Sequence, residues 1–253
     1  MDNLIGLIIV LVSAGLIAIF TLLRRKIPGS DLRTIPAIQR LRRAVGLAVE
    51  DGKRLHVSLG RSNILSPTNA SAFVGLASLE RLAQLSRISD RPPLATSGDG
   101  VLSLLSQDTL RGAYRLGNSL EQYDPDRGRF SGPTPFSYIA GAMPVIAREQ
   151  VSTTLLIGNF GPEAALFCDL AAQNQSFTLA ASDSLPAQAV LYATAQEPLI
   201  GEEIFAVPAY LKAGAAQSAS LRVQDILRWV LIAFLLFAFI IKLIEVLLGV
   251  KLL

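Results

Sequence analysis

The fold is decided by the stretch Thr153-Thr154-Leu155-Leu156-Ile157, which is followed by the loop Gly158-Asn159-Phe160-Gly161 and by Pro162. The first five residues are apolar or β-branched throughout, with no polar alternation, which is typical of a strand covered on both faces. Glycines favour a tight turn, and proline suits the first turn of a helix. The stretch therefore predicts a strand, a loop and a helix that runs to about Ala172.

The same order of strand, loop and helix occurs three more times. The other strands are predicted at 54–59, 94–96 and 176–180, and each is followed by a loop of Gly, Ser, Asn or Asp and a helical pattern. Four such units predict a Rossmann-like α/β domain, with a parallel sheet of about four strands flanked by helices. A mixed α+β sheet is the alternative, because the strand at 94–96 is short. Residues 117–135 are rich in turn formers and charge and are expected to form a long surface loop.

Both ends of the chain carry an apolar stretch. Residues 4–23 contain no charge and are followed by Arg24, Arg25 and Lys26, and a second stretch runs over 229–248. Twenty helical residues span about 30 Å, the thickness of the hydrocarbon core. Because the cations follow the first stretch, they indicate a membrane anchor more than a cleaved signal peptide. We therefore expect one transmembrane helix at each end, both termini outside a bacterial inner membrane, and the central domain in the cytoplasm.

These features divide the chain into five segments. They are an N-terminal anchor with its basic stop (1–26), a linker with an amphipathic basic helix (27–53), the cytoplasmic α/β domain (54–211), a linker with a polar helical turn (212–228) and a C-terminal transmembrane helix (229–253). Lys242 and Glu245 interrupt the last helix and share one of its faces. Either they mark its outer end, with Lys242 reaching the headgroups, or they form a pair inside a helix–helix contact.

The charge is unevenly distributed along the chain. The formal net charge is +3, while residues 24–54 alone carry an excess of about six positive charges. Three of these cations, Arg40, Arg42 and Arg43, belong to the predicted helix 36–51, which either packs on the domain or lies at the headgroup boundary. Cations beside a membrane helix attract anionic lipid. The basic region has no aromatic residue, so nucleic acid is not expected as a partner.

The sequence contains no recognisable catalytic or metal-binding set. Its single cysteine, Cys168, excludes an intrachain disulfide, and with the single histidine, His56, it is too little for a His/Cys zinc site. We expect both side chains to be buried structural residues. The dinucleotide fingerprint, the phosphate-binding loop and the nucleophile elbow are all missing from the sequence. No cofactor, metal or catalytic residue is therefore predicted.

The loops that follow the predicted strands are the one candidate binding site. The carboxyl ends of parallel strands meet at one edge of a sheet, where glycines let a ligand approach the backbone. The candidate ligand-binding residues are Gly60, Arg61, Ser97, Gly98, Asp99, Gly158, Asn159 and Glu163. The same glycines and polar residues are also what tight turns and helix caps require, so a purely structural role is the alternative.

Residues 88–100, Ile-Ser-Asp-Arg-Pro-Pro-Leu-Ala-Thr-Ser-Gly-Asp-Gly, together with the flanking apolar ends, resemble an uncharacterised family of bacterial membrane proteins, a domain of unknown function. The resemblance implies no activity or cofactor. From the residues we expect a non-enzymatic, self-associating structural or assembly component, since small-residue helices at 137–147 and 212–219 favour close packing. A homo-oligomer and the lipid bilayer are the expected partners. The alternative function is a membrane-anchored domain that binds a small molecule or nucleotide, including an enzymatic one.

Overall fold

The computed structural model describes residues 2–23, 33–64, 70–87, 89 and 91–248. The chain forms two compact units, one of Asp31–Ala213 and one of Met1–Ser30 with Gly214–Leu253. We describe each unit by itself.

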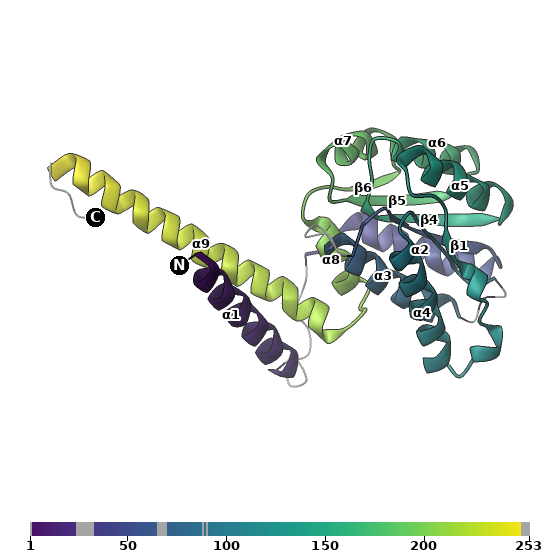
Figure 1. Ribbon diagram of the computed structural model, residues 1–253, viewed down its shortest axis with the longest axis horizontal. Coiled ribbons are helices and arrows are strands. Elements are labelled where there is room, and N and C mark those ends of the chain that lie inside the picture. Colours follow the sequence, from purple (N-terminus) through teal and green to yellow (C-terminus); the bar gives the residue numbers. More distant parts are fainter. Residues whose placement is uncertain (1, 24–32, 65–69, 88, 90, 249–253) are drawn as a thin grey trace. The chain divides into compact units, whose positions relative to one another are not determined.

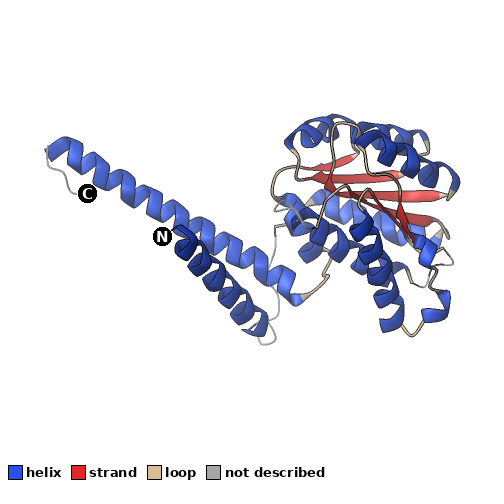
Figure 2. Cartoon of the chain, in the orientation of Figure 1, coloured by secondary structure: helices blue, strands red, loops and turns tan. Residues whose placement is uncertain are grey.

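A six-stranded parallel sheet forms the centre of unit 31–213 (Figure 2). Its order is β3-β2-β1-β4-β5-β6, and every neighbouring pair is parallel. The strands are β1 (Arg54–Gly60), β2 (Leu94–Ser97), β3 (Gly128–Phe130), β4 (Val151–Asn159), β5 (Phe177–Ser182) and β6 (Glu197–Leu199). The predicted parallel α/β architecture is therefore confirmed, and the mixed sheet is excluded.

The predicted number of strands was too low, because both edge strands were missed. Strand β3 lies within the segment expected to be a surface loop. It follows two short 3-10 helices, η1 (Leu120–Gln122) and η2 (Pro125–Arg127), and precedes helix α5 (Pro135–Arg148). Each edge strand has only three residues, and β6 contains Pro198, which an edge strand tolerates because one of its sides is unpaired. Neither segment has a local apolar pattern that could have revealed it.

Helices cover both faces of the sheet (Figure 1). One face carries α2 (Pro36–Glu50), α3 (Ala70–Ser86), α4 (Gly100–Leu116) and α8 (Glu203–Tyr210), and the other carries α5 (Pro135–Arg148), α6 (Ala164–Gln173) and α7 (Leu185–Thr194). Two apolar cores lie between these layers. Fully buried leucines such as Leu79 and Leu82 fill the first core, and Phe167 fills the second, together with Tyr138. Replacing one of these leucines with alanine is expected to lower the free energy of unfolding by about 2–5 kcal/mol.

Helix α2 packs on the domain, which was one of its two interpretations. Its buried side chains recur at helical spacing: Ala37, Ile38, Leu41, Val45 and Ala48. Its arginines lie on the exposed side, as the amphipathic pattern requires. Pro36 occupies the first helical turn, where its missing N–H costs no hydrogen bond.

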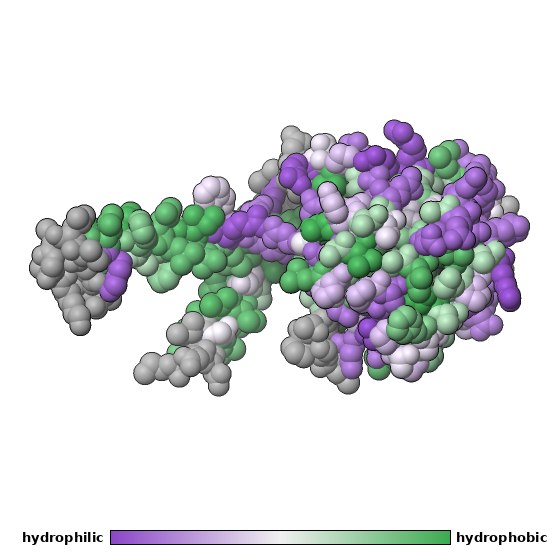
Figure 3. Space-filling view, turned by 90° about the horizontal axis from the view of Figure 1, so that it is seen from above, coloured by the Kyte–Doolittle hydropathy of each residue, from purple (hydrophilic) through white to green (hydrophobic). Residues whose placement is uncertain are grey.

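The other unit contains two helices, α1 (Asp2–Leu23) and α9 (Ala215–Leu248), which contact each other. Within the described chain, one helical stretch, Ala215–Ile244, is long and apolar enough to cross a membrane. Its most apolar part is not buried in the protein, whereas Ser218, Ala219 and Val223 near its start are buried. Figure 3 shows the apolar surface along α9. The apolar part of α1, Gly6–Leu22, is shorter, so the structure shows one candidate membrane helix, at the C-terminal end, where the sequence predicts one at each end.

Candidate functional site

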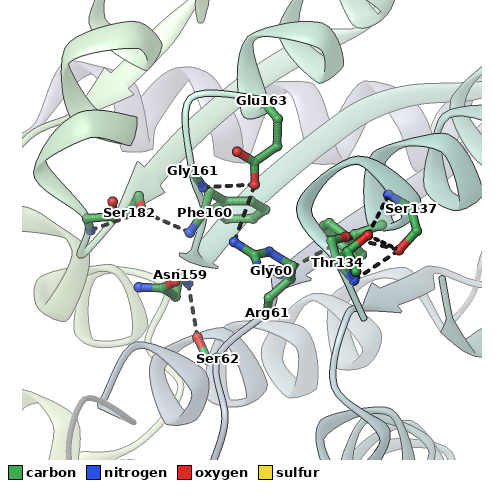
Figure 4. A network of polar contacts seen from close by, with 12 residues as sticks. Gly60, Arg61, Ser62, Thr134, Ser137, Asn159, Phe160, Gly161, Glu163 and Ser182 are labelled. Carbon is green, nitrogen blue, oxygen red and sulfur yellow. Dashed lines mark hydrogen bonds and ion pairs between the residues drawn. The ribbon is translucent and has the colours of Figure 1, made fainter. Parts of the chain in front are cut away.

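The strand order reverses between β1 and β4, which lie side by side in the middle of the sheet. In open parallel sheets, ligands bind outside the carboxyl ends of the strands at such a reversal. Here the two strands end at Gly60 and Asn159. We use the name strand-end site for the residues around these two ends, which are Gly60, Arg61, Ser62, Ser71, Gly98, Gly158, Asn159, Glu163 and Asp183. Figure 4 labels five of them, Gly60, Arg61, Ser62, Asn159 and Glu163.

The glycines of the strand-end site let β1 and β4 approach each other closely. Gly60 and Gly158 have φ values of +68° and +156°, which favour glycine. A side chain on Gly60 would overlap the backbone of Asn159, and one on Gly158 would overlap the backbone of Leu59. The amide of Arg61 also donates to the carbonyl oxygen of Asn159, at 2.9 Å. Backbone from the neighbouring strand therefore occupies the space that a ligand would need beside these two glycines.

Four polar residues close a ring of hydrogen bonds beside these strand ends. The backbone N–H of Asn159 donates to Ser62 Oγ at 3.0 Å, and the Ser62 and Ser71 hydroxyls lie 3.1 Å apart. Ser71 then donates to one oxygen of Asp183 at 2.6 Å, and the side-chain amide of Asn159 donates to the other at 2.8 Å. The ring links β1, β4, β5 and α3. Both carboxylate oxygens of Asp183 are thus engaged inside the protein.

Arg61 and Glu163 point toward each other at the strand-end site (Figure 4). Arg61 Nη2 lies 3.5 Å from Glu163 Oε1, which also accepts a hydrogen bond from the Gly161 amide at 3.1 Å. The Glu163 side chain is almost completely buried, and Arg61 Nε is buried without a hydrogen-bond partner among the described residues. The charge of Arg61 is therefore largely used to stabilise Glu163, which leaves one buried donor unsatisfied.

Ser97, Gly98 and Asp99 serve the local backbone. Asp99 is the N-cap of α4, and its carboxylate accepts from the amide of Leu102 at 2.9 Å. Ser97 donates to the carbonyl oxygen of Asp99 at 3.0 Å. The Gly98 amide donates to the Gly60 carbonyl oxygen at 2.8 Å, and a side chain on Gly98 would overlap Arg61. Of these three predicted residues, Gly98 belongs to the strand-end site, while Asp99 is a helix cap.

A buried polar cluster lies in the core beside Gly60. The Tyr138 hydroxyl is 2.5 Å from Ser58 Oγ and accepts from the Gly60 amide at 3.3 Å. His56 Nε2 is 2.9 Å from Thr96 Oγ1, whereas His56 Nδ1 has no partner in the described chain. Burial, aided by the charge of Arg129, lowers the pKa of His56 to about 3. The imidazole is therefore neutral near pH 7 and acts as a core residue.

Cys168 is a buried residue of α6. Burial raises the pKa of its thiol to about 11, so the thiol stays protonated near neutral pH and is a poor nucleophile. In the described part of the chain, no group of three His, Cys, Asp or Glu side chains is arranged to hold a metal ion.

Sequence reasoning missed Ser62, Ser71 and Asp183 as residues of the strand-end site, and Tyr138 as part of the buried polar cluster beside it. Ser62 and Asp183 lie in the loops that follow predicted strands, so their positions gave a signal. Ser71 lies inside a helical pattern and Tyr138 on an apolar helix, and nothing in their spacing indicates that they meet residues about 110 and 80 positions away.

The predicted membrane-surface residues have separate environments. Arg40 forms a 2.8 Å ion pair with Glu197, Arg42 donates to the carbonyl oxygen of Tyr210, and Arg43 is exposed. Residues 24–26, the predicted basic stop, lie outside the described residues. Of the predicted intramembrane pair, Lys242 is exposed on α9, and the side chain of Glu245 is not among those described.

A family model described as a domain of unknown function, DUF6754, matches residues 1–253, so the chain belongs to this family. The resemblance to a family of unknown function is thereby confirmed. No curated protein and no solved structure matches the chain.

Proposed function

We propose that this member of the DUF6754 family is a membrane protein that works by self-association, as a structural or assembly component and not as an enzyme. In this proposal the protein belongs to a bacterial inner membrane, with unit 31–213 in the cytoplasm and both termini outside.

The apolar helices support the membrane location. Helix α9 contains an uncovered stretch long enough to span the hydrocarbon core. We propose that α1 is a second anchor, because its 17 apolar residues, Gly6–Leu22, extend about 26 Å at 1.5 Å per residue. That length is at the lower limit for a transmembrane helix. The cations at 24–26 would then attract anionic lipid at the cytoplasmic surface.

Contacts within unit 31–213 hold its two ends together, which supports attachment to the membrane from both ends. Arg33 forms a 2.9 Å ion pair with Glu203, and its carbonyl oxygen accepts a 2.6 Å hydrogen bond from the Tyr210 hydroxyl. The segments leading to α1 and α9 therefore leave the domain at neighbouring points. Two anchors that start close together would confine each domain to the membrane plane and raise its effective concentration for association.

The single observation that carries the non-enzymatic interpretation is the closed ring at the strand-end site. The hydrogen bonds of this ring join polar groups of the protein to one another, in Asn159, Ser62, Ser71 and Asp183. A catalytic crevice needs polar groups that are directed at a substrate. These side chains instead stabilise the reversal point of the sheet.

Exposed apolar side chains support self-association. Helices α3 to α7 each follow a parallel strand directly, so they begin at the carboxyl edge of the sheet. Each carries at least one large exposed apolar residue in its first two turns: Phe73, Val101, Leu104, Phe136, Leu166 and Leu185. We call these six residues the apolar rim. Contiguous exposed apolar patches are typical of protein–protein interfaces, and we propose that copies of the chain meet at this edge.

The size of the assembly tests this proposal. The full chain, extracted in mild detergent, is expected to give a single species larger than one protomer in light scattering coupled to size exclusion. The measured mass must be corrected for bound detergent and followed over a range of protein concentrations. A monomer at every concentration would contradict self-association.

A second function, binding of a small anionic molecule or nucleotide, is favoured by one observation. Arg61 lies at the reversal point and has a buried Nε without a described partner, a donor that a ligand could satisfy. Thermal unfolding of the full chain with a panel of nucleotides tests it, with Arg61→Gln as the matched variant. A rise in melting temperature that is lost in the variant would favour ligand binding over the structural role.

A further inference from the structure

A cavity of about 470 Å³ lies on the opposite side of unit 31–213 from α5, α6 and α7, in the layer formed by α2, α3 and α8. Such a volume falls within the range of small-molecule sites. The lining residues come from the C-terminal halves of α2 and α3 and from the end of α8: Arg42, Val45, Gly46, Val49, Glu50, Arg81, Leu82, Leu85, Leu211 and Lys212.

The lining is amphiphilic and carries excess positive charge. Apolar side chains from all three helical segments form its walls, while Arg42, Arg81 and Lys212 supply three cations against the carboxylate of Glu50. Among the ion pairs of the described residues, none involves any of these three cations. The cavity therefore fits a ligand with both an anionic group and an apolar part.

Backbone contacts hold the two arginines in place. Arg81 Nε donates to the Leu211 carbonyl oxygen at 3.0 Å, and Arg42 Nη2 donates to that of Tyr210. Arg81 Nη1 also donates to Gln84 Oε1 at 3.2 Å. These contacts cap the C-terminal end of α8, where cations are favourable. A guanidinium has five N–H donors, so both arginines keep donors for a ligand.

Lys212 completes the charged side of the cavity from the segment that leads to α9. Its φ of +60° places it in the left-handed region, and its amide donates to the Ala209 carbonyl oxygen at 3.0 Å, which ends α8. Glycine is the residue that this conformation favours. Replacing Lys212 with glycine therefore removes the ammonium group without straining the backbone.

We propose that this cavity binds one anionic phospholipid, with its phosphate at Arg42, Arg81 and Lys212 and its glycerol and upper acyl carbons against Val45, Leu82 and Leu85. The proposal rests on the proposed membrane location. Chain connectivity supports a lipid source, since Lys212 lies three residues before the first residue of α9, and the hydrogen bond between Arg33 and Tyr210 brings the other exit of the unit near the same end of α8. The apolar walls would have no role in binding free phosphate.

Native mass spectrometry of the full chain released from detergent tests the proposal. The protein is first equilibrated with phosphatidylglycerol or with phosphatidylcholine. We expect one retained phosphatidylglycerol per protomer and about tenfold weaker retention in Arg81→Gln and in Lys212→Gly, the loss expected for one charge-assisted contact. Arg43→Gln is the matched control, because it removes the same charge from an exposed position of α2 outside the cavity. Circular dichroism checks that each variant is folded.

Three results would overturn the proposal. The first is equal loss in Arg43→Gln, which would indicate diffuse attraction between charges. The second is equal retention of phosphatidylcholine. The third is displacement of the lipid by millimolar inorganic phosphate, which would indicate a site for the free anion. Carbonate extraction of membranes, done in parallel, tests the membrane location separately. A chain that resists extraction and retains no lipid leaves the proposed function intact and removes only the lipid site.

Discussion

The hydroxyl of Tyr210 donates a 2.6 Å hydrogen bond to the carbonyl oxygen of Arg33, a residue 177 positions earlier in the chain. The contact joins the first described residue of unit 31–213 to the last residue of α8. Because the chain continues from these two points toward α1 and α9, the bond fixes the distance between the two exits of the domain.

Replacing Tyr210 with phenylalanine removes this hydrogen bond and keeps the aromatic ring that packs against the core. We expect the free energy of unfolding to fall by about 1 kcal/mol or less, since the bond is exposed to water. Thermal unfolding of the full chain in detergent measures the change. Tyr192→Phe is the control, because the Tyr192 side chain is exposed on α7. Equal changes in the two variants would contradict a stabilising role for the contact between Arg33 and Tyr210.

Replacing Asp183 with alanine should destabilise the protein more than replacing Asp99. Asp183→Ala leaves Ser71 and the side-chain amide of Asn159 without their acceptor, at a cost of about 2–3 kcal/mol. Asp99→Ala removes one helix cap, which is worth about 1 kcal/mol. Chemical unfolding curves of both variants measure the difference. A fully stable Asp183→Ala protein would show that the ring is not structural and would favour a ligand-binding role for Asp183.

Burial of His56 makes stability depend on pH. The folded-state pKa of about 3 lies below the ordinary value of 6.5, so between these two values the unfolded chain binds a proton that the folded chain does not. Stability is therefore greatest above pH 6.5 and decreases as the pH falls toward 3. From pH 7 to pH 5 this single group should cost about 2 kcal/mol.

Melting temperatures at pH 7 and pH 5 measure this dependence, with His56→Gln as the comparison. We expect the variant to have a lower melting temperature at pH 7, because glutamine fits the core less well, but to lose less stability on acidification than the natural protein. The same drop in both proteins would assign the pH dependence to other groups.

The architecture was predictable where the signal was local. Buried parallel strands such as β4 need consecutive apolar residues and a loop of small residues, and both are visible in Thr153–Gly161. Strands β3 and β6 depend on pairing with a neighbour, since Gly-Arg-Phe and Glu-Pro-Leu have no preference for a strand that would stand out in the sequence.

The candidate site was predictable only in its location. Topology rules place Arg61, Asn159 and Glu163 at one edge of the sheet, and the structure brings them there. The same rules do not say whether a polar side chain faces a ligand or another side chain. The Asp99 carboxylate accepts from the Leu102 amide as a helix cap, and the Asp183 carboxylate accepts from the Asn159 side chain in the ring. Only the three-dimensional arrangement distinguishes these structural roles from ligand binding.

The apolar rim provides the most direct test of self-association. Leu185 and Leu116 are the same residue type with nearly equal exposure, 77% and 71%, but Leu185 begins α7 at the carboxyl edge and Leu116 ends α4 at the opposite edge. Neither side chain contributes much to the core, so serine at either position should leave the fold stable. If the rim forms the contact between copies, Leu185→Ser should weaken association by about tenfold, as expected for a residue that contributes about 1–2 kcal/mol to the free energy of association. Leu116→Ser should leave association unchanged. Assembly mass measured against protein concentration compares the two variants, and equal effects would rule out the rim as the interface.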